Sequence, residues 1–255
     1  MKKITLSLLF ILILTLCSCA SNKDVPLLSE TEASTESSKQ QVIEATHETE
    51  MVEESTSPIA LEPVYVYSDA IEYFLEPFDD CSWDRSGNVE FIMLHFTSAI
   101  VEHRDDPFNM QYIRQTFLDY KISVHYIIDR DGTIYCYMPE NRAAWHAGYG
   151  EWNNDPKYTN DINPYSIGIE LLAIGSESDM STYLTSEEYA QINDDWKGFT
   201  DAQYKALNPL IDDLCERYDV PRDKEHIIGH EEFSPSKNDP GELFDWNKIV
   251  PQSIS

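Results

Sequence analysis

The sequence predicts an α/β fold in which helices flank a mixed central β-sheet. Short apolar segments of strand length alternate with amphipathic segments of helix length, and one tight turn joins two of the strand segments. That turn, Asp129-Arg130-Asp131-Gly132, lies between apolar segments at 124–128 and 133–137 and predicts a β-hairpin with Gly132 at a positive φ. Alternating strands and helices with one hairpin indicate a sheet that contains both parallel and antiparallel pairs.

Three further segments are predicted to be strands. Residues 89–94 form a largely apolar pattern typical of a buried strand, and this strand delivers His95 at its C-terminal end. Residues 166–172 are also strongly apolar. Residues 226–229 form a brief extended segment before a loop rich in proline and aspartate.

Two segments are predicted to be helices. Residues 108–120 suit a helix with an inner side formed by Ile113, Phe117 and Tyr120. Thr200 is the predicted N-cap of a helix that runs to about residue 218. The inner face of this second helix is formed by Tyr204, Leu207, Ile211 and Leu214. Pro209 lies inside it and should kink the helix or split it in two.

The N-terminal segment predicts a secretory signal with a lipid-attachment site. A basic start precedes an apolar run at 4–16 that is too short for a comfortable membrane span. The run ends in Leu16-Cys17-Ser18-Cys19, which fits the bacterial lipoprotein pattern, with Cys19 as the lipidated N-terminus after cleavage behind Ser18. Acyl chains on Cys19 would anchor the protein to the cell membrane outside the cytoplasm, facing the cell wall. The alternative is an ordinary signal peptide with incidental cysteines.

The chain is therefore predicted to consist of a lipoprotein signal peptide at 1–18, a tether at 19–60 and a single domain at 61–255. The tether segment is rich in Ser, Thr and Glu and has few apolar residues. Such a composition cannot bury enough surface to fold, so a disordered, self-repelling tether is expected. The tether would extend the range of a lipid-anchored domain and let it work at some distance into the wall.

Three cysteines, Cys81, Cys136 and Cys215, lie in the predicted domain. They show no CxxC spacing of the kind that forms a metal knuckle, and three cysteines cannot all pair within one chain. One disulfide with a free thiol and three reduced core residues are both compatible with the sequence.

The formal net charge of −28 limits the partners of the chain. It argues against nucleic-acid binding, which needs a basic face. It also argues against a broad electrostatic attraction to anionic wall polymers. A metal ion and a cleft would therefore have to hold the substrate. Nothing in the sequence indicates more than a monomer.

Side chains able to bind a catalytic zinc stand at two strand ends and in the loop that follows. Such a zinc takes three protein ligands and keeps a fourth position for water. His95 closes one strand, His230 follows another, and Asp239 lies nine residues further on, in a loop long enough to fold back. Lys237 would point into the same space. Spacing alone does not establish a metal site, because a histidine at a strand end is more often a hydrogen-bonded structural residue.

Together these residues stand in blocks that resemble the type 2 N-acetylmuramoyl-L-alanine amidases. The blocks read IMLHFT at 92–97, SVHYIIDRDG at 123–132, AWHAG at 144–148, NPYSIGIE at 163–170, GH at 229–230, SKNDPG at 236–241 and FDW at 244–246. They follow the order of the family over about residues 88–248. The family shares its fold with phage amidase-lysozymes and animal peptidoglycan recognition proteins, so the resemblance implies a single amidase-like domain.

The resemblance also implies a zinc cofactor, with His95, His230 and Asp239 as its ligands. Aspartate as the third ligand is typical of the branch that includes the anhydromuramyl-peptide amidases, whereas many relatives have cysteine there. Lys237 is implied to polarise the scissile carbonyl and Glu170 to be the general base. Other branches use a tyrosine where this chain has Val124, which favours Glu170 for that role.

Further positions are assigned by the same resemblance. Trp145 and His146 border the substrate cleft in the family, so they are implied to bind substrate, although His146 is equally compatible with a hydrogen-bonded histidine on the cleft rim. His125 is implied to support the metal site without ligating it. Two residues depart from the family pattern: Phe96 replaces a frequent His or Asn, and Ser236 replaces a frequent Arg. Both departures could alter substrate fit.

The predicted reaction is hydrolysis of the amide between N-acetylmuramic acid and L-alanine in peptidoglycan or muropeptides. Zinc would lower the pKa of a bound water towards 7, Glu170 would accept its proton, and Lys237 would stabilise the oxyanion. The main alternative is a non-catalytic peptidoglycan-binding module, which in this fold usually lacks a zinc ligand or the base. A second alternative is a metal hydrolase that cuts another amide in the wall.

Overall fold

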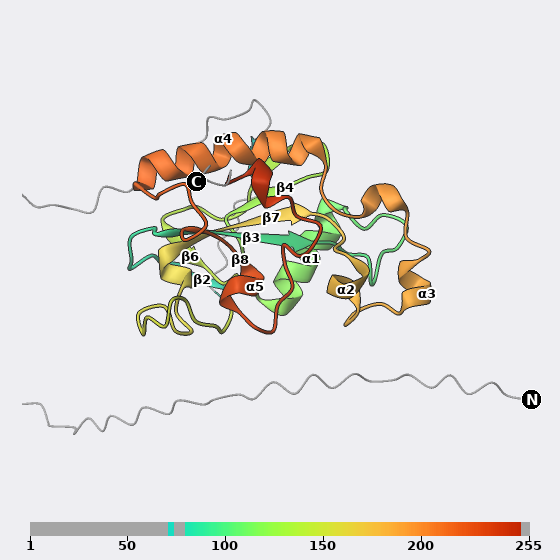
Figure 1. The fold of residues 1–255 in the computed structure, drawn as a ribbon, viewed down its shortest axis with the longest axis horizontal. Helices are drawn as coiled ribbons and strands as arrows, with labels where there is room; N and C mark the ends of the chain where they lie inside the picture. Colours follow the sequence, from blue (N-terminus) through green and yellow to red (C-terminus); the bar gives the residue numbers. More distant parts are fainter. Residues whose placement is uncertain (1–70, 74–79, 251–255) are drawn as a thin grey trace, which may run out of the picture. The chain divides into compact units, whose positions relative to one another are not determined.

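The computed structural model describes residues 71–73 and 80–250 (Figure 1). The predicted signal peptide, the predicted tether and the predicted start of the domain at residue 61 lie outside these residues. The lipid-attachment site at Cys19 therefore stays a prediction.

A six-stranded sheet lies at the centre of the domain, in the order β1-β5-β4-β7-β3-β8. Its strands are β1 (Ile71–Tyr73), β3 (Phe91–Thr97), β4 (Tyr126–Ile128), β5 (Ile134–Cys136), β7 (Ser166–Leu172) and β8 (Ile227–Gly229). Strands β4 and β5 are antiparallel and the other neighbours are parallel, so the predicted mixed sheet is confirmed. A separate antiparallel pair consists of β2 (Ser82–Asp84) and β6 (Arg142–Ala144).

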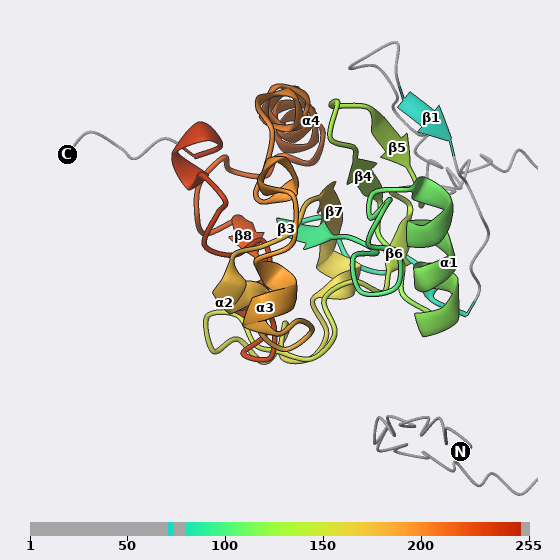
Figure 2. The same ribbon diagram turned by 90° about the vertical axis from the view of Figure 1, so that its right-hand side faces the viewer.

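Helices cover both faces of the central sheet (Figure 2). Helix α4 (Asp201–Tyr218) lies along one face, and α1 (Met110–Tyr120) lies on the other. The short helices are α2 (Glu177–Met180), α3 (Ser186–Tyr189) and α5 (His230–Phe233), and the 3-10 turns are η1 (Asn163–Tyr165), η2 (Asp194–Trp196) and η3 (Trp246–Lys248). Within the described residues, no helix has the length and apolar character needed to cross a membrane.

Strands β3 and β7 divide their side chains between the two faces of the sheet. One set packs in the core under α4: Ile92, Leu94, Ile167, Ile169 and Leu171. The predicted inner face of α4 belongs to the same core. Because successive side chains of a strand point to opposite faces, the residues between these, including His95 and Glu170, face away from α4. The functional site is therefore built on the face opposite the long helix.

The predicted hairpin is confirmed by the pairing of β4 with β5. Gly132 has a φ of 90°, and its amide donates to the carbonyl oxygen of Asp129 at 2.9 Å. The conformation at Gly132 is one that side-chain-bearing residues rarely adopt.

Helix α1 begins at Met110, where the Asn109 side chain accepts a hydrogen bond from the Gln111 amide and caps the first turn. Ile113 and Phe117 are buried as predicted. Tyr120 was placed on the inner side, and this prediction is wrong, because Tyr120 is 64% exposed. It is the last residue of the helix, and the chain then turns through a left-handed residue.

Helix α4 has the predicted N-cap Thr200 and ends at Tyr218, as expected. Pro209 does not split it, since α4 is a single helix of 18 residues. Proline removes a backbone donor from the helix. The helix nevertheless continues through it, with Leu207, Leu210, Ile211 and Leu214 of its inner face packed in the core.

Replacing Thr200 with alanine should lower the free energy of unfolding by about 1–2 kcal/mol. Thr200 Oγ1 accepts from the Gln203 amide at 3.1 Å and donates to the carbonyl oxygen of Arg130 at 2.7 Å, so it both caps α4 and ties it to the hairpin. Urea unfolding measures the effect. Thr200→Ser keeps the hydroxyl and is the matched control. Equal unfolding midpoints for the alanine and serine variants would contradict the role of the cap.

The three cysteines of the described domain are free thiols. Cys81 and Cys136 are buried and Cys215 is partly buried. Burial raises the pKa of Cys136 to about 12 and that of Cys215 to about 11, so both are protonated at neutral pH. Buried, protonated thiols of this kind are unreactive.

Candidate metal centre

Three side chains predicted as zinc ligands converge at one point. His95 Nδ1 lies 3.0 Å from His230 Nδ1 and 2.8 Å from Asp239 Oδ2. His230 Nδ1 lies 2.9 Å from the same oxygen of Asp239. Within the described residues, these three form the one group of His, Cys, Asp and Glu side chains whose ligand atoms are close enough to share an ion.

The sheet brings these residues together from distant parts of the chain. His95 lies in β3, and its neighbour in register on β7 is Glu170. On the other side of β3, Leu94 pairs with Gly229, so β8 delivers His230 at the next position, where α5 begins. The following loop folds back, as predicted, because the Glu231 amide donates to the carbonyl oxygen of Asp239 at 2.9 Å.

The donor set fits a metal ion such as zinc. Two imidazole nitrogens and one carboxylate oxygen are common zinc ligands. His230 Nε2 lies 2.9 Å from the carbonyl oxygen of Ala147, to which it can only donate, so its proton sits on Nε2 and its Nδ1 lone pair faces the other two groups. Burial, with His230 as a second cause, lowers the pKa of His95 to about 4, so its imidazole is neutral at pH 7. Burial alone would raise the pKa of Asp239, but His230 and His95 hold it well below its ordinary value.

Glu170 is the fourth polar group of the centre. Its Oε2 atom is buried and has no hydrogen-bond partner among the described residues. Burial, and after it the charge of Asp239, raises the pKa of Glu170 well above its ordinary value, whereas Lys237 acts in the opposite direction. Lys237 itself is exposed, and its charge affects both Glu170 and His95. Glu170 is thus a register neighbour of His95, and the charge of Lys237 acts on both groups.

The two residues predicted to bind substrate lie in different surroundings. Trp145 is 40% exposed and makes an edge contact with Trp83, with ring centroids 5.8 Å apart. His146 instead lies behind His95, with its Nδ1 atom 3.0 Å from His95 Nε2. Burial and then His95 hold the pKa of His146 well below its ordinary value.

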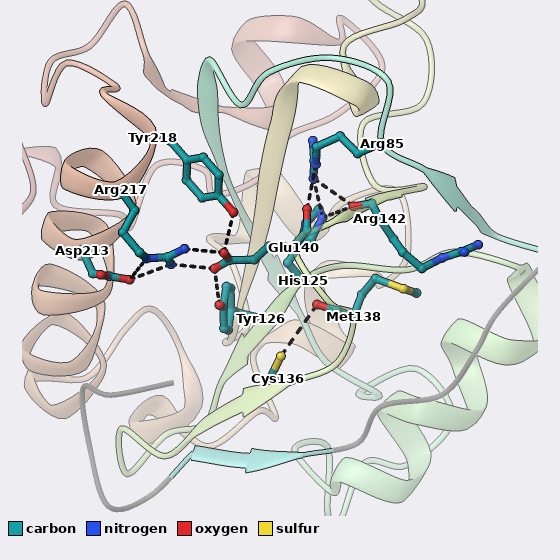
Figure 3. Close-up of polar contacts among 10 residues, drawn as sticks. All are labelled: Arg85, His125, Tyr126, Cys136, Met138, Glu140, Arg142, Asp213, Arg217 and Tyr218. Carbon is teal, nitrogen blue, oxygen red and sulfur yellow. Dashed lines mark hydrogen bonds and ion pairs between the residues drawn. The ribbon is translucent and has the colours of Figure 1, made fainter. Parts of the chain in front are cut away.

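The polar contacts between Arg85 and the buried His125 were not found from the sequence (Figure 3). Arg85 donates to the carbonyl oxygens of Glu140 at 2.8 Å, Pro164 at 2.8 Å and Arg142 at 2.9 Å. Its Nη2 atom also lies 2.8 Å from His125 Nε2. Burial, and then Arg85, lowers the pKa of His125 to about 3.

His125 itself stands apart from the three candidate ligands. Its Nδ1 atom accepts from the amide of Gly168 at 2.9 Å, which leaves that nitrogen no lone pair for a metal. This placement of His125 agrees with a residue that lies near the metal site without binding the metal. Carbonyl acceptors and ring nitrogens carry no sequence pattern that could have revealed Arg85 as their partner.

The fold and this cluster define an α/β protein in which two buried histidines and a partly buried aspartate form a group suited to a metal. The profile of the family described as N-acetylmuramoyl-L-alanine amidase matches residues 85–242. The chain belongs to this family, and the match includes the three candidate ligands, Glu170 and Lys237.

Individual relatives agree with this assignment. The chain is 28% identical over 174 residues to the N-acetylmuramoyl-L-alanine amidase AmiD of Escherichia coli (strain K12), a match that covers 65% of this chain and 54% of AmiD. It is 32% identical over 132 residues to the 1,6-anhydro-N-acetylmuramyl-L-alanine amidase AmpD of Haemophilus influenzae, covering 51% and 58% of the two chains. The chain thus spans about half the length of the curated relatives it matches.

A solved structure supports the fold. The crystal structure of a selenomethionine AmpD derivative has a TM-score of 0.50 and 25% sequence identity, and covers 72% of this chain and 94% of that chain. The predicted amidase-like fold is confirmed.

Proposed function

We propose that this chain is a zinc-dependent N-acetylmuramoyl-L-alanine amidase, which hydrolyses the amide between N-acetylmuramic acid and L-alanine in peptidoglycan or muropeptides. The observation that carries the proposal is the convergence of His95, His230 and Asp239 with Glu170 on the neighbouring strand, whose buried Oε2 atom has no hydrogen-bond partner among the described residues. A binding module needs no proton acceptor at the metal, whereas a hydrolase does. The names of AmiD and AmpD describe amidases of this substrate class and support the same reading.

Each residue of the centre has a chemical task in this proposal. His95, His230 and Asp239 would hold zinc, which when bound polarises a carbonyl and makes water more acidic. Glu170 takes the proton of the attacking water and returns it to the leaving amine of L-alanine. Its raised pKa suits both steps, because a carboxylate that holds a proton more tightly is a stronger base. Lys237 places a positive charge near the carbonyl oxygen, where negative charge develops.

The proposed location is the outer face of the cell membrane, with Cys19 as the lipid anchor. It is supported by the apolar N-terminal run and the Leu16-Cys17-Ser18-Cys19 pattern. Residues 19–60 would then act as the tether between the anchor and a monomeric domain. Radiolabelled palmitate should enter the chain in a bacterial host and fail to enter the Cys19→Ala variant.

Zinc-dependent release of stem peptides from peptidoglycan is the expected result that tests the function. The purified chain is incubated with peptidoglycan and with soluble muropeptides, and mass spectrometry identifies the products. Free stem peptides with a new L-alanine N-terminus should appear, vanish with a chelator, and return when zinc is added back.

Two other outcomes would contradict the proposal. Tight binding to muropeptides without cleavage would instead support the peptidoglycan-binding module. Products cut at a peptide–peptide bond would support a hydrolase of another amide in the wall.

A further inference from the structure

One face of strand β7 stands directly behind the metal centre. Its alternate residues Ser166, Gly168 and Glu170 share that face, because side chains of a strand repeat every second position. The proposed function uses only Glu170. The other two residues have a common neighbour, the ring of His146.

A chain of hydrogen bonds runs from this strand to the first candidate ligand. Ser166 Oγ lies 3.0 Å from the carbonyl oxygen of Ile162, and 3.0 Å from His146 Nε2. On the other side of the ring, His146 Nδ1 lies 3.0 Å from His95 Nε2. All three distances are those of ordinary hydrogen bonds.

The chemistry of the end groups sets the direction of every bond in this chain. A carbonyl oxygen only accepts, so the single hydroxyl proton of Ser166 goes to Ile162. Ser166 must then accept from His146, which puts the proton of that ring on Nε2. His146 Nδ1 is left as an acceptor, and it takes the Nε2 proton of His95. The Nδ1 lone pair of His95 is thereby directed at His230 and Asp239, as metal ligation requires.

Gly168 makes the room that this arrangement needs. A β-carbon at position 168 would lie 2.7 Å from His146 Cγ and 2.8 Å from its Nδ1. Side-chain atoms do not approach a β-carbon so closely, so any larger residue at position 168 would displace the ring. Gly168 does not have a positive φ, so the glycine is needed here because its missing side chain leaves room for the ring of His146.

We propose that His146, held by Ser166 and accommodated by Gly168, is a positioning residue that fixes the tautomer and orientation of the zinc ligand His95. This inference rests on the proposed zinc site and replaces the substrate-binding role expected for His146. Both nitrogens of its ring are already engaged within the protein, so neither is free for the substrate. Trp145, the neighbouring candidate, stays on the surface.

The test compares zinc affinity in the full-length wild-type chain and in variants, measured by competition with a chromophoric chelator. His146→Leu removes the acceptor for His95 and should weaken zinc binding about 10–100-fold, the usual effect of losing a partner behind a metal ligand. His146→Asn is the conservative variant, because its side-chain oxygen can accept the same proton, and it should restore most of the affinity. Tyr149→Ala changes a side chain that is 72% exposed in the same loop and should leave zinc affinity unchanged.

Two further variants keep the test decisive if His146→Leu folds poorly. Ser166→Ala keeps the ring but removes its anchor, and Gly168→Ala keeps every hydrogen-bonding group but moves the ring. Both should weaken zinc binding, with thermal unfolding of the metal-free forms as the check on folding. Long-range ¹H–¹⁵N spectra of the imidazoles in the zinc-loaded wild type should show a proton on Nε2 of His95 and on Nε2 of His146.

The outcomes separate this inference from the proposed function. If wild type binds zinc and cuts muropeptides while the folded variants bind zinc equally well, only the positioning role is overturned. A rise in KM for muropeptides in His146→Leu at unchanged zinc affinity would also overturn it and restore the substrate role. Failure of the wild-type chain to bind zinc would overturn both proposals.

Discussion

Replacing Glu170 with glutamine should lower the rate of amide cleavage about 10²–10⁴-fold, the usual contribution of a positioned acid–base group. Glutamine keeps the size of the side chain and one acceptor oxygen but cannot accept the proton of the attacking water. The zinc content should not change, because Glu170 is not one of the three residues whose ligand atoms converge at the centre. The loss should therefore appear in kcat for muropeptide cleavage, measured on chains with equal bound zinc.

The matched control is Glu216→Gln, which changes an exposed glutamate of α4, on the opposite face of the sheet. It should cleave at the wild-type rate. The wild-type rate should also fall with decreasing pH at values above 4.5, the ordinary pKa of a glutamate, because the active form of Glu170 is the deprotonated one. A Glu170→Gln chain that cleaves at the wild-type rate would exclude Glu170 as the base.

Much of the fold was predictable because local pattern and tertiary structure agree in the central strands. Residues 166–172 form β7 with the predicted bounds, and strands β3 and β7 carry apolar side chains where they face α4. The parallel register then makes His95 and Glu170 neighbours. The resemblance to the family implies that His95 and Glu170 belong to one site. The register of the sheet explains physically why these two residues, far apart in the sequence, lie side by side.

The parts that escaped prediction depend on contacts between distant segments. The inner side of helix 108–120 was extended to Tyr120 because periodicity cannot reveal where the core stops. Pro209 does not split α4, a single helix of 18 residues that packs its inner face against the core of the sheet. The sequence left His146 open between substrate binding and a hydrogen-bonded position, because its partners, His95 and Ser166, lie 51 and 20 residues away along the chain. A single sequence does not show which polar side chains form hydrogen bonds with one another when they lie far apart along the chain.

The Glu140→Gln variant should lose about 3 kcal/mol of unfolding free energy at neutral pH, near the lower end for breaking a buried ion pair. Glu140 is 5% exposed and accepts from Arg217 at 2.6 Å and 2.8 Å, from the Tyr218 hydroxyl at 2.6 Å, and from the Tyr126 hydroxyl (Figure 3). The network joins the end of α4 to β4 and to the chain before β6. Asp213 stays as a partner of Arg217 in the variant, which is why the lower end of the range is expected.

The pH dependence of stability distinguishes this ion pair from ordinary packing. Burial alone would raise the pKa of Glu140, but the hydrogen bonds from Arg217, Tyr126 and Tyr218 hold it below its ordinary value of 4.5. A carboxylate with a lowered folded-state pKa stabilises the fold fully above its unfolded-state pKa and loses this contribution as the pH falls through the folded-state value.

The difference in unfolding free energy between wild type and Glu140→Gln, measured by urea unfolding, should therefore be constant from pH 8 to about 5.5 and shrink below about 4.5. Glu216→Gln, on the exposed side of the same helix, should follow wild type throughout. A difference that stays constant down to pH 3 would show that glutamine disturbs packing and that the charge of Glu140 contributes nothing.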